Sequence, residues 1–526
     1  MRIEIYDTTL RDGAQSPGVT FTLRDKLRVI ASLDEFGADY IEAGNPSSNQ
    51  KDMELFAEAA KLPLQHSKLV AFGATRRPGG KACEDGALRG LIDACTPAVA
   101  IFGKSWLMHV TSVLGTSAEE NLAMIDDTVR FLKGEGREVI FDAEHFFDGY
   151  KDDPEYAMSV LRSAKNAGAD VLCLCDTNGG CLPGEIKSVV ERVVREIAGR
   201  VSIHCHNDSG LAEASSVEAV LCGATQVQGT VLGLGERCGN ANLSVLIPTL
   251  FFKCGAQFNR VDTEKLREIY SLSRNIAELA NIAVNESMPY VGSYAFTHKA
   301  GMHIDAVNKT SASFEHISPE SVGNVRNTLV SEVAGRAALL NKMKQILPEV
   351  TKDSPVTIQT MEMVKSRENE GYQYENADGS LALLILAAAG KRKSFYELKT
   401  YKLVLTEPDG SQSEPLSAAL IKISVGDGEE ITAAEGDGPV NALDKALRKA
   451  LLRFYPAIDR TRLIDYKVRV LNSSDATGAK VRVIIETTDG QTVWRTVGVS
   501  SDIIQASWIA LCDSIEYALS RDDGLL

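Results

Sequence analysis

The first 21 residues of the chain, MRIEIYDTTLRDGAQSPGVTF, contain a short strand pattern that ends in a cluster of polar side chains. Residues 3–7 (IEIYD) form the strand-like run, Asp7 closes it, and Arg11 and Asp12 follow. A plain turn does not need an arginine beside an aspartate. The cluster therefore indicates a functional site at a strand end, provided that later strands end in groups of the same kind.

Short apolar runs alternate with helical patterns over the first 255 residues. One helical pattern opens with Ser117 and Glu120 in capping-box spacing. Eight such runs predict an α/β fold, a (β/α)₈ TIM barrel over residues 1–255. A doubly wound open sheet has the same alternation and remains an alternative, although the first strand–helix turn lacks the G-x-G-x-x-G of its dinucleotide-binding form. The strand-like runs are residues 3–7, 40–44, 68–74, 99–103, 138–144, 171–176, 201–206 and 226–233.

Two further regions follow the predicted barrel. Residues 256–390 carry mostly helical patterns and predict helical linker subdomains. Residues 391–526 contain a weak internal repeat of two strands and a helix, with hairpin turns predicted at Asp427-Gly428 and Asp489-Gly490. This predicts a small α+β domain. Because it carries no cluster of acid and base groups, we expect it to serve regulation or dimerisation.

The composition is that of an ordinary globular protein, with 44% hydrophobic and 24% charged residues. The net charge of −15 argues against nucleic acid or an anionic membrane as the main partner. The sequence shows no leader peptide and no apolar run long enough to span a bilayer. The ten cysteines form no C-x-x-C pair and fit small buried side chains in a reducing cytosol. We therefore expect a cytoplasmic protein.

Polar side chains recur at the ends of the predicted strands, where barrel enzymes carry their active sites. His204 and His206 lie two apart, so a strand points both to the same face. With Asp12 they make a set of two histidines and one carboxylate, which suits a divalent cation. An H-x-H pair alone is more often structural, but the chain has only eight histidines. Further groups at strand ends are Glu42, Glu144, His145, Asp176, Thr177, Glu236, Arg237 and Asn240.

Four motifs occur in a fixed order along the barrel region: DTTLRDGAQ (7–15), EHFFDGYK (144–151), SIHCHNDSGLA (202–212) and GERCGNANL (235–243). They resemble the signatures of the DRE-TIM metallolyase superfamily, in its branch of 2-isopropylmalate, homocitrate and citramalate synthases. The resemblance is strongest to the citramalate synthase type. It continues through FTHKAGMHIDAVNK and FEHISPESVGN in the helical region. The last 130 residues are similar to the leucine-binding regulatory domain of isopropylmalate synthases.

The resemblance implies a Claisen condensation of acetyl-CoA with a 2-oxo acid, pyruvate in the citramalate type, on a route to isoleucine. It also implies a divalent cation, Mn²⁺, Mg²⁺ or Zn²⁺. The cation would be held by Asp12, His204 and His206, with Asn240 as an additional ligand, and would act as a Lewis acid.

The resemblance also assigns roles to residues around that cation. Arg11 would stabilise negative charge on the keto oxygen, although an ion pair that orients a neighbouring aspartate is an equally simple role. Thr177 would hydrogen-bond the substrate carboxylate, and Glu144 would lie beside the substrate. Glu236 and His303 would form the general-base dyad, with His303 from the helical region and in one arrangement from a neighbouring subunit.

Two positions depart from the family pattern. Phe314 stands where relatives carry tyrosine, and Leu232 stands where they carry asparagine. The departures put in doubt any role of that phenol and the shape of the turn before Glu236. Neither departure touches the predicted metal ligands.

The resemblance predicts a homodimer with isoleucine as feedback inhibitor and leucine as the second candidate. Three alternatives remain open. A 2-isopropylmalate or homocitrate-like synthase would need room for a larger 2-oxo acid. A lyase that runs the reverse cleavage is disfavoured by the regulatory domain. A catalytically inactive amino-acid sensor is disfavoured by the complete set of Arg11, Asp12, His204 and His206.

Overall fold

The computed structural model describes the whole chain except residues 49, 329–334, 375–376, 407–415, 472–478 and 491. The described residues form two compact units. The first contains Met1–Phe296 and His316–Arg326, and the second contains Thr297–Glu315 and Asn327–Leu526. The three-part division at residues 255 and 390, which follows secondary structure rather than contacts, stays a prediction.

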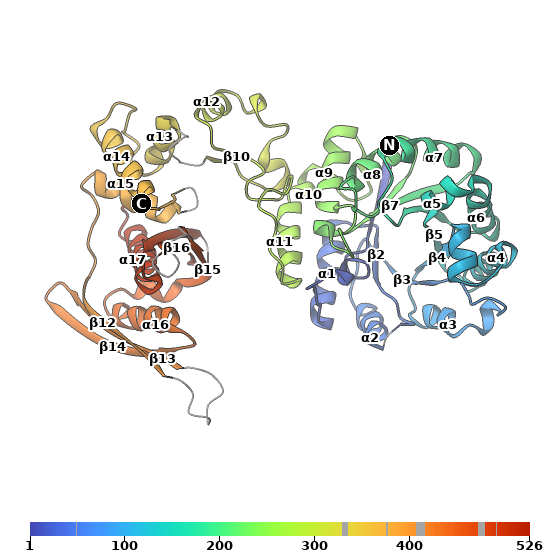
Figure 1. The fold of residues 1–526 in the computed structure, drawn as a ribbon, viewed down its shortest axis with the longest axis horizontal. Coiled ribbons are helices and arrows are strands. Elements are labelled where there is room, and N and C mark those ends of the chain that lie inside the picture. Colours follow the sequence, from blue (N-terminus) through green and yellow to red (C-terminus); the bar gives the residue numbers. More distant parts are fainter. Residues whose placement is uncertain (49, 329–334, 375–376, 407–415, 472–478, 491) are drawn as a thin grey trace. The chain divides into compact units, whose positions relative to one another are not determined.

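Eight parallel strands close a barrel in the first unit (Figure 1). β1 pairs with β2 on one side, with Tyr6 opposite Tyr40, and with β8 on the other, with Ile5 opposite Val227. In an open sheet the first and the last strand would not pair with each other. Because β1 and β8 do pair here, the sheet is closed, which confirms the predicted TIM barrel. The strands are β1 Arg2–Asp7, β2 Tyr40–Gly44, β3 Lys68–Ala74, β4 Ala98–Lys104, β5 Glu138–Glu144, β6 Val171–Asp176, β7 Arg200–Cys205 and β8 Gln226–Gly229.

Helices cover the outside of the barrel and bury their apolar faces against the strands. Thr22 and Asp25 form a complete capping box at the start of α1. The box predicted for α4 is only half formed: Ser117 accepts from the Glu120 N–H, but the Glu120 carboxylate binds Arg76 instead. The covering helices are α1 Leu23–Phe36, α2 Gln50–Ala59, α3 Gly86–Asp93, α4 Ala118–Gly134, α5 Phe146–Asp152, α6 Pro154–Ala167, α7 Pro183–Glu196, α8 Ala212–Leu221 and α9 Leu243–Cys254.

The eighth strand is shorter than the predicted run 226–233. It ends at Gly229, and residues 231–233 form a 3₁₀ turn in which Leu232 has φ 64°. This left-handed conformation costs a leucine about 1 kcal/mol, whereas asparagine tolerates it better. Asparagine is the residue that the family pattern puts here. Leu232 packs against Val19 and Ala280, and this burial offsets the backbone cost.

Side chains two apart on a strand share the barrel interior. On β5, Glu138 lies at the amino-terminal end, Ile140 in the apolar middle layer, and Asp142 and Glu144 toward the carboxyl end. The apolar layer also contains Tyr6, Val70, Ala100, Val171 and Cys173. This layer forms the floor below the polar groups at the carboxyl rim.

The region after the barrel is mainly helical, as predicted. The pattern from Glu332 to Ile346 predicts one of these helices; residues 332–334 lie outside the described residues, and α13 begins at Gly335. α15 is buried along almost its whole length, against the core of the second unit. The elements are β9 Gln257–Phe258, α10 Thr263–Leu266, α11 Ile269–Leu279, β10 Thr297–His298, α12 Gly301–Lys309, β11 Asn327–Thr328, α13 Gly335–Ile346, α14 Pro355–Asn369 and α15 Asp378–Ala388.

The C-terminal repeat consists of two modules, each with a three-stranded antiparallel sheet and one helix (Figure 1). The sequence pattern missed the first strand of each module. It also misplaced one turn: Val425 pairs with Gly428, so the turn residues are Gly426 and Asp427. The modules are β12 Glu397–Thr406, β13 Leu416–Val425, β14 Gly428–Gly436 and α16 Pro439–Leu452, then β15 Arg462–Val470, β16 Val481–Thr488, β17 Val493–Ser500 and α17 Ile503–Asp522.

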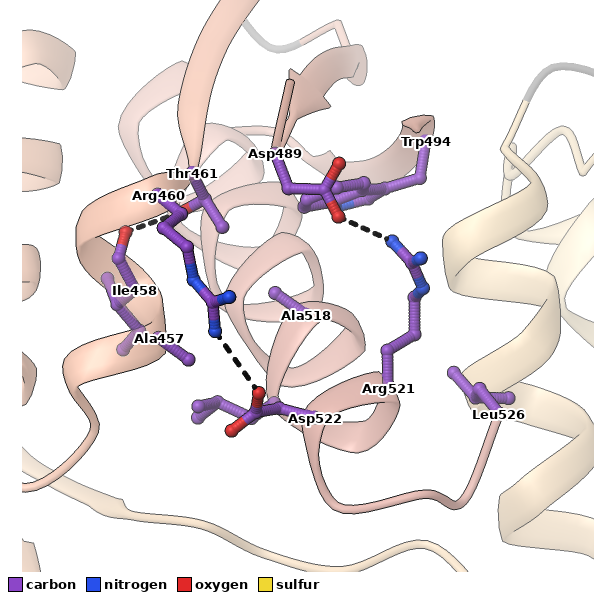
Figure 2. A pocket seen from close by; sticks show the side chains of 11 residues that line it. Ala457, Ile458, Arg460, Thr461, Asp489, Trp494, Ala518, Arg521, Asp522 and Leu526 are labelled. Atoms are coloured by element: carbon purple, nitrogen blue, oxygen red, sulfur yellow. Dashed lines mark hydrogen bonds and ion pairs between the residues drawn. The ribbon is translucent and has the colours of Figure 1, made fainter. Parts of the chain in front are cut away.

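A salt bridge joins the last helix to the hairpin of the second module. Figure 2 shows Arg521 of α17 reaching Asp489, 2.9 Å away, beside the buried ring of Trp494. A cavity of about 290 Å³ lies between this pair and the 3₁₀ turn Pro456–Arg460. Arg460 faces it from the opposite wall, 3.5 Å from Asp522.

The described part of the chain contains no helix with both the length and the apolar character needed to cross a bilayer. The cytoplasmic location expected from the sequence stays a prediction.

Candidate active site

A cavity of about 180 Å³ opens at the carboxyl ends of the barrel strands. Four strands, β1, β5, β6 and β7, or the loops that follow them supply the predicted site residues that line it. The lining residues are Arg11, Asp12, Phe72, Phe102, Asp142, Glu144, Cys175, Thr177, His204 and His206. The barrel therefore brings six of the residues that the sequence predicts, Arg11, Asp12, Glu144, Thr177, His204 and His206, to one place.

Asp12, His204 and His206 converge and could hold a metal ion. The Nε2 atoms of the two histidines lie 3.3 Å apart, and Oδ2 of Asp12 lies 3.5 Å from His204 Nε2 and 3.8 Å from His206 Nε2. Ligands held at about 2.1 Å from one metal lie about 3.0 to 3.5 Å from each other. The observed spacing is therefore close to that of a metal-binding set.

Asn240 lies directly beside these three residues. An isolated β-bridge pairs it with His206, just beyond the end of β7. Its Nδ2 donates to Leu234 O at 2.9 Å, while its buried Oδ1 has no hydrogen-bond partner among the described residues. A buried amide oxygen without a partner is costly unless a ligand completes it. The unpartnered oxygen therefore supports the predicted role of Asn240 as an additional metal ligand.

Burial and charge set the protonation of the three converging residues. Burial lowers the pKa of both imidazoles, and for His204 the neighbouring His206 lowers it further. Burial alone would raise the pKa of Asp12, but the Arg11 guanidinium and then the two histidines outweigh it and lower that pKa. Neutral imidazoles and an ionised carboxylate are the forms that bind a cation.

Arg11 is held on three sides. Its Nε donates to Glu42 Oε1 at 2.5 Å, and its Nη1 lies 3.3 Å from Asp12 Oδ2. Its guanidinium stacks over the ring of Phe72, 3.9 Å from the centroid. The ion pair with Asp12, given above as the alternative role of Arg11, is therefore present. It does not exclude a second role, because Arg11 also lines the cavity.

Glu144 and Thr177 lie on neighbouring strand ends. Glu144 Oε2 forms an ion pair with Lys104 Nζ. The Thr177 hydroxyl oxygen accepts the His145 N–H at 2.8 Å, which leaves its own proton for an acceptor in the cavity. His145 has a left-handed backbone, with φ 55°, that turns the chain from β5 into α5.

No sequence motif points to Phe72, Phe102, Asp142 or Cys175, although all four line the cavity. Asp142 accepts from Gln228 at 3.2 Å, and burial raises its pKa to about 7, with nearby Glu42 as the next cause. Strand periodicity could have predicted Asp142 in the site, because it lies two residues before Glu144 on the same strand and therefore points to the same face.

The predicted general-base dyad is divided between the two units. Glu236 is exposed in the loop after β8 of the first unit. His303 lies on α12 of the second unit, where its ring stacks on Phe314 with 4.0 Å between centroids. Phe314 thus keeps an aromatic contact with His303 although it lacks the phenol of the family. The dyad itself stays a prediction.

Comparison with protein families matches three consecutive parts of the chain. The HMGL-like family matches residues 2–273, the homocitrate synthase post-HMGL domain-like family matches residues 290–370, and the LeuA allosteric (dimerisation) domain matches residues 375–519. The order of the three is barrel, helical region and C-terminal modules.

Relatives align along nearly the whole chain. A protein of Aquifex aeolicus named (R)-citramalate synthase is 50% identical over 523 residues, 99% of this chain and 98% of that protein. A protein of Geobacter sulfurreducens with the same name is 45% identical over the same shares of both chains. A probable 2-isopropylmalate synthase of Methanopyrus kandleri is 32% identical over 96% of each chain.

We expect Asp12→Asn and His206→Ala each to lose bound metal, because each removes one of three converging ligands. The measurement is metal content by mass spectrometry after dialysis against Mn²⁺, Mg²⁺ or Zn²⁺, with circular dichroism to show that the barrel is folded. His66→Ala, an exposed histidine away from the cavity, is the control and should bind like the wild type. Stoichiometric metal in folded His206→Ala would contradict the assignment.

Proposed function

The chain belongs to the α-isopropylmalate/homocitrate synthase family of DRE-TIM metallolyases, and we propose that within this family it is an (R)-citramalate synthase. It condenses acetyl-CoA with pyruvate and water to give citramalate and CoA. The observation that carries this choice is the full-length similarity to five relatives of that name, which are 43–50% identical to the chain, whereas the probable 2-isopropylmalate synthase of Methanopyrus kandleri is 32% identical.

The shape of the cavity supports pyruvate as the 2-oxo acid. Phe72 and Phe102 stack with 5.4 Å between their ring centroids and line one wall. A cavity of about 180 Å³ is small for a ligand pocket. We propose that these two rings limit the alkyl group of the 2-oxo acid, since a 2-isopropylmalate synthase must admit an isopropyl group where pyruvate has a methyl group.

The converging ligand atoms and the unpartnered oxygen of Asn240 fit a divalent cation held by Asp12, His204, His206 and Asn240. A cation bound there supplies Lewis-acid polarisation of the keto group. The oxygen and nitrogen donors suit Mn²⁺, Mg²⁺ or Zn²⁺.

The remaining residues of the cavity bind and orient the substrate. Arg11 donates hydrogen bonds to the keto oxygen as negative charge develops on it, and Glu42 and Phe72 hold the guanidinium in place for this role. Thr177 donates its free hydroxyl proton to the pyruvate carboxylate. Glu144, held by Lys104, lies beside the substrate.

Glu236 and His303 act as the dyad that removes a methyl proton from acetyl-CoA, with His303 as the base and Glu236 as the group that raises its basicity. The support is the position of both residues in family motifs. The stacking of Phe314 on His303 would fix the plane of the imidazole.

The C-terminal modules make the protein a homodimer and bind isoleucine as a feedback inhibitor. The support is the match of residues 375–519 to an allosteric and dimerisation domain. An inhibitor acts in this way if it binds two arrangements of the protein with different affinity. Isoleucine is the first candidate because citramalate lies on a route to it.

Arg11→Lys keeps the positive charge but loses the planar fork that can bind two oxygens at once. We expect kcat to fall by roughly 10², the scale of losing one oxyanion donor, with unchanged metal content. The assay is CoA release with pyruvate and acetyl-CoA. Arg24→Lys, an exposed position on α1, is the control. A variant that loses its metal instead would show that Arg11 is purely structural.

Phe102→Ala enlarges the wall that limits the 2-oxo acid. We expect the ratio of kcat/KM for 2-oxoisovalerate to that for pyruvate to rise roughly tenfold, the scale of one or two methyl groups in an apolar pocket. Phe102→Leu should give an intermediate ratio. If wild type prefers 2-oxoisovalerate, the 2-isopropylmalate alternative is correct. If the wild type releases no CoA with any 2-oxo acid, the result supports the alternative of a catalytically inactive amino-acid sensor.

Isoleucine should inhibit the whole protein more strongly than leucine or valine. The measurements are CoA release and calorimetric titration of the full-length chain. The full chain is needed because removing residues 391–526 would uncover the buried α15. His206→Ala should still bind isoleucine, since it leaves the C-terminal modules intact. If none of the three amino acids binds or inhibits, the modules serve dimerisation alone.

A further inference from the structure

A second cavity, of about 690 Å³, lies on the same rim of the barrel as the metal site. The loops that line it follow β2 and β3, whose side chains Glu42 and Phe72 contact Arg11 in the catalytic cavity. Its walls include Ser47, Met53, Arg77, Lys81, Gly86 and Gly90. Neither the sequence motifs nor the proposed catalytic groups account for it.

The loop after β3 is fixed by a buried arginine. Arg76 is 6% exposed and donates to Asp127 and to Glu120, both at 2.7 Å. The same two carboxylates also accept the backbone N–H groups of Ala82 and Gly79. The loop therefore has a defined shape, and it presents the next arginine, Arg77, to the cavity.

Of the two cations in this cavity, Arg77 has no carboxylate partner among the described residues and Lys81 has a loose one. In the described part of the chain, no carboxylate pairs with the exposed Arg77 guanidinium. Lys81 is 73% exposed and lies 3.4 Å from Glu84, a loose surface pair. The carboxylate of Asp85 is already used, because it accepts the N–H groups of Arg77 and Ala87.

Glycines keep the space around these cations open. A side chain at Gly86 would point into empty space, and at Gly80 it would meet only the Arg77 carbonyl, at 3.4 Å. A ligand can therefore approach the backbone here. Glu84 and Asp85 also line the cavity, but backbone N–H groups hold the carboxylate of Asp85, so it does not neutralise the Arg77 guanidinium.

We propose that this cavity binds the phosphate groups of the acetyl-CoA substrate through Arg77 and Lys81, so that the acyl arm reaches the metal cavity along the ends of β2 and β3. The inference rests on the proposed function, because acetyl-CoA is the phosphate-bearing substrate of that reaction. Pyruvate needs only the smaller cavity. Phosphate oxygens take charge-assisted hydrogen bonds from arginine and lysine, which are stronger than neutral ones.

The test compares Arg77→Ala, Lys81→Ala and the double variant with wild type in the CoA-release assay. Each single variant should raise the KM for acetyl-CoA about tenfold, the scale of one lost charge-assisted hydrogen bond. The kcat, the KM for pyruvate and the metal content should not change. With acetyl-pantetheine, which carries no phosphate ester at this position, the variants and wild type should be equal.

Arg89→Ala is the matched control, since Arg89 is exposed on α3 but does not line the cavity. An equal rise in KM for Arg89→Ala would show a general effect of charge and overturn the proposal. An unchanged KM for acetyl-CoA in the double variant, or an equal rise with acetyl-pantetheine, would also overturn it. Failure of the proposed function would appear separately, as wild type that releases no CoA with pyruvate.

Discussion

The ion pair between Arg11 and Glu42 is the interaction on which the barrel rim depends. Three carboxylates, Glu42, Asp12 and Asp142, are almost fully buried there, and Arg11 is the guanidinium that faces them. Breaking one partner of such a buried pair costs about 3 to 5 kcal/mol, because the other charge is left uncompensated. The pair therefore has a structural role before any catalytic one. It fixes the side chain that stands between the metal ligands and the substrate.

One cation cannot neutralise three buried acids, and protonation supplies part of the difference. Burial raises the pKa of Asp142 to about 7. The pKa of Asp12 is lowered instead, because Asp12 lies next to both Arg11 and the two imidazoles. Neighbouring carboxyls with separated pKa values are typical of active sites. The fold thus keeps ionised the one carboxylate that a metal ion requires.

The sequence predicted the residues whose position follows from strand periodicity, and it missed those that depend on packing. The H-x-H spacing and the strand ends were enough to bring Asp12, His204 and His206 together, since parallel strands share a rim. Phe72 and Phe102 carry no such signal, because an aromatic residue in a strand is usually core. The left-handed turn at Leu232 and the ion pairs of Arg76 with Glu120 and Asp127 of α4 depend on contacts between segments far apart in the sequence. The pattern of a single strand does not encode such contacts.

The two ends of the barrel differ in how their buried charged groups are paired. At the amino-terminal end, Glu138 pairs with Lys68 and Arg200, and Arg200 also binds Glu4 and the Tyr40 hydroxyl. Each charged side chain in that group has a partner of opposite sign, and these ion pairs hold neighbouring strands together. At the carboxyl end, the Nε2 atoms of His204 and His206 face one carboxylate, and Asn240 Oδ1 lacks a partner among the described residues. A cation bound here would complete both the converging ligand set and the amide oxygen of Asn240, and among the described residues that set occurs at the carboxyl end.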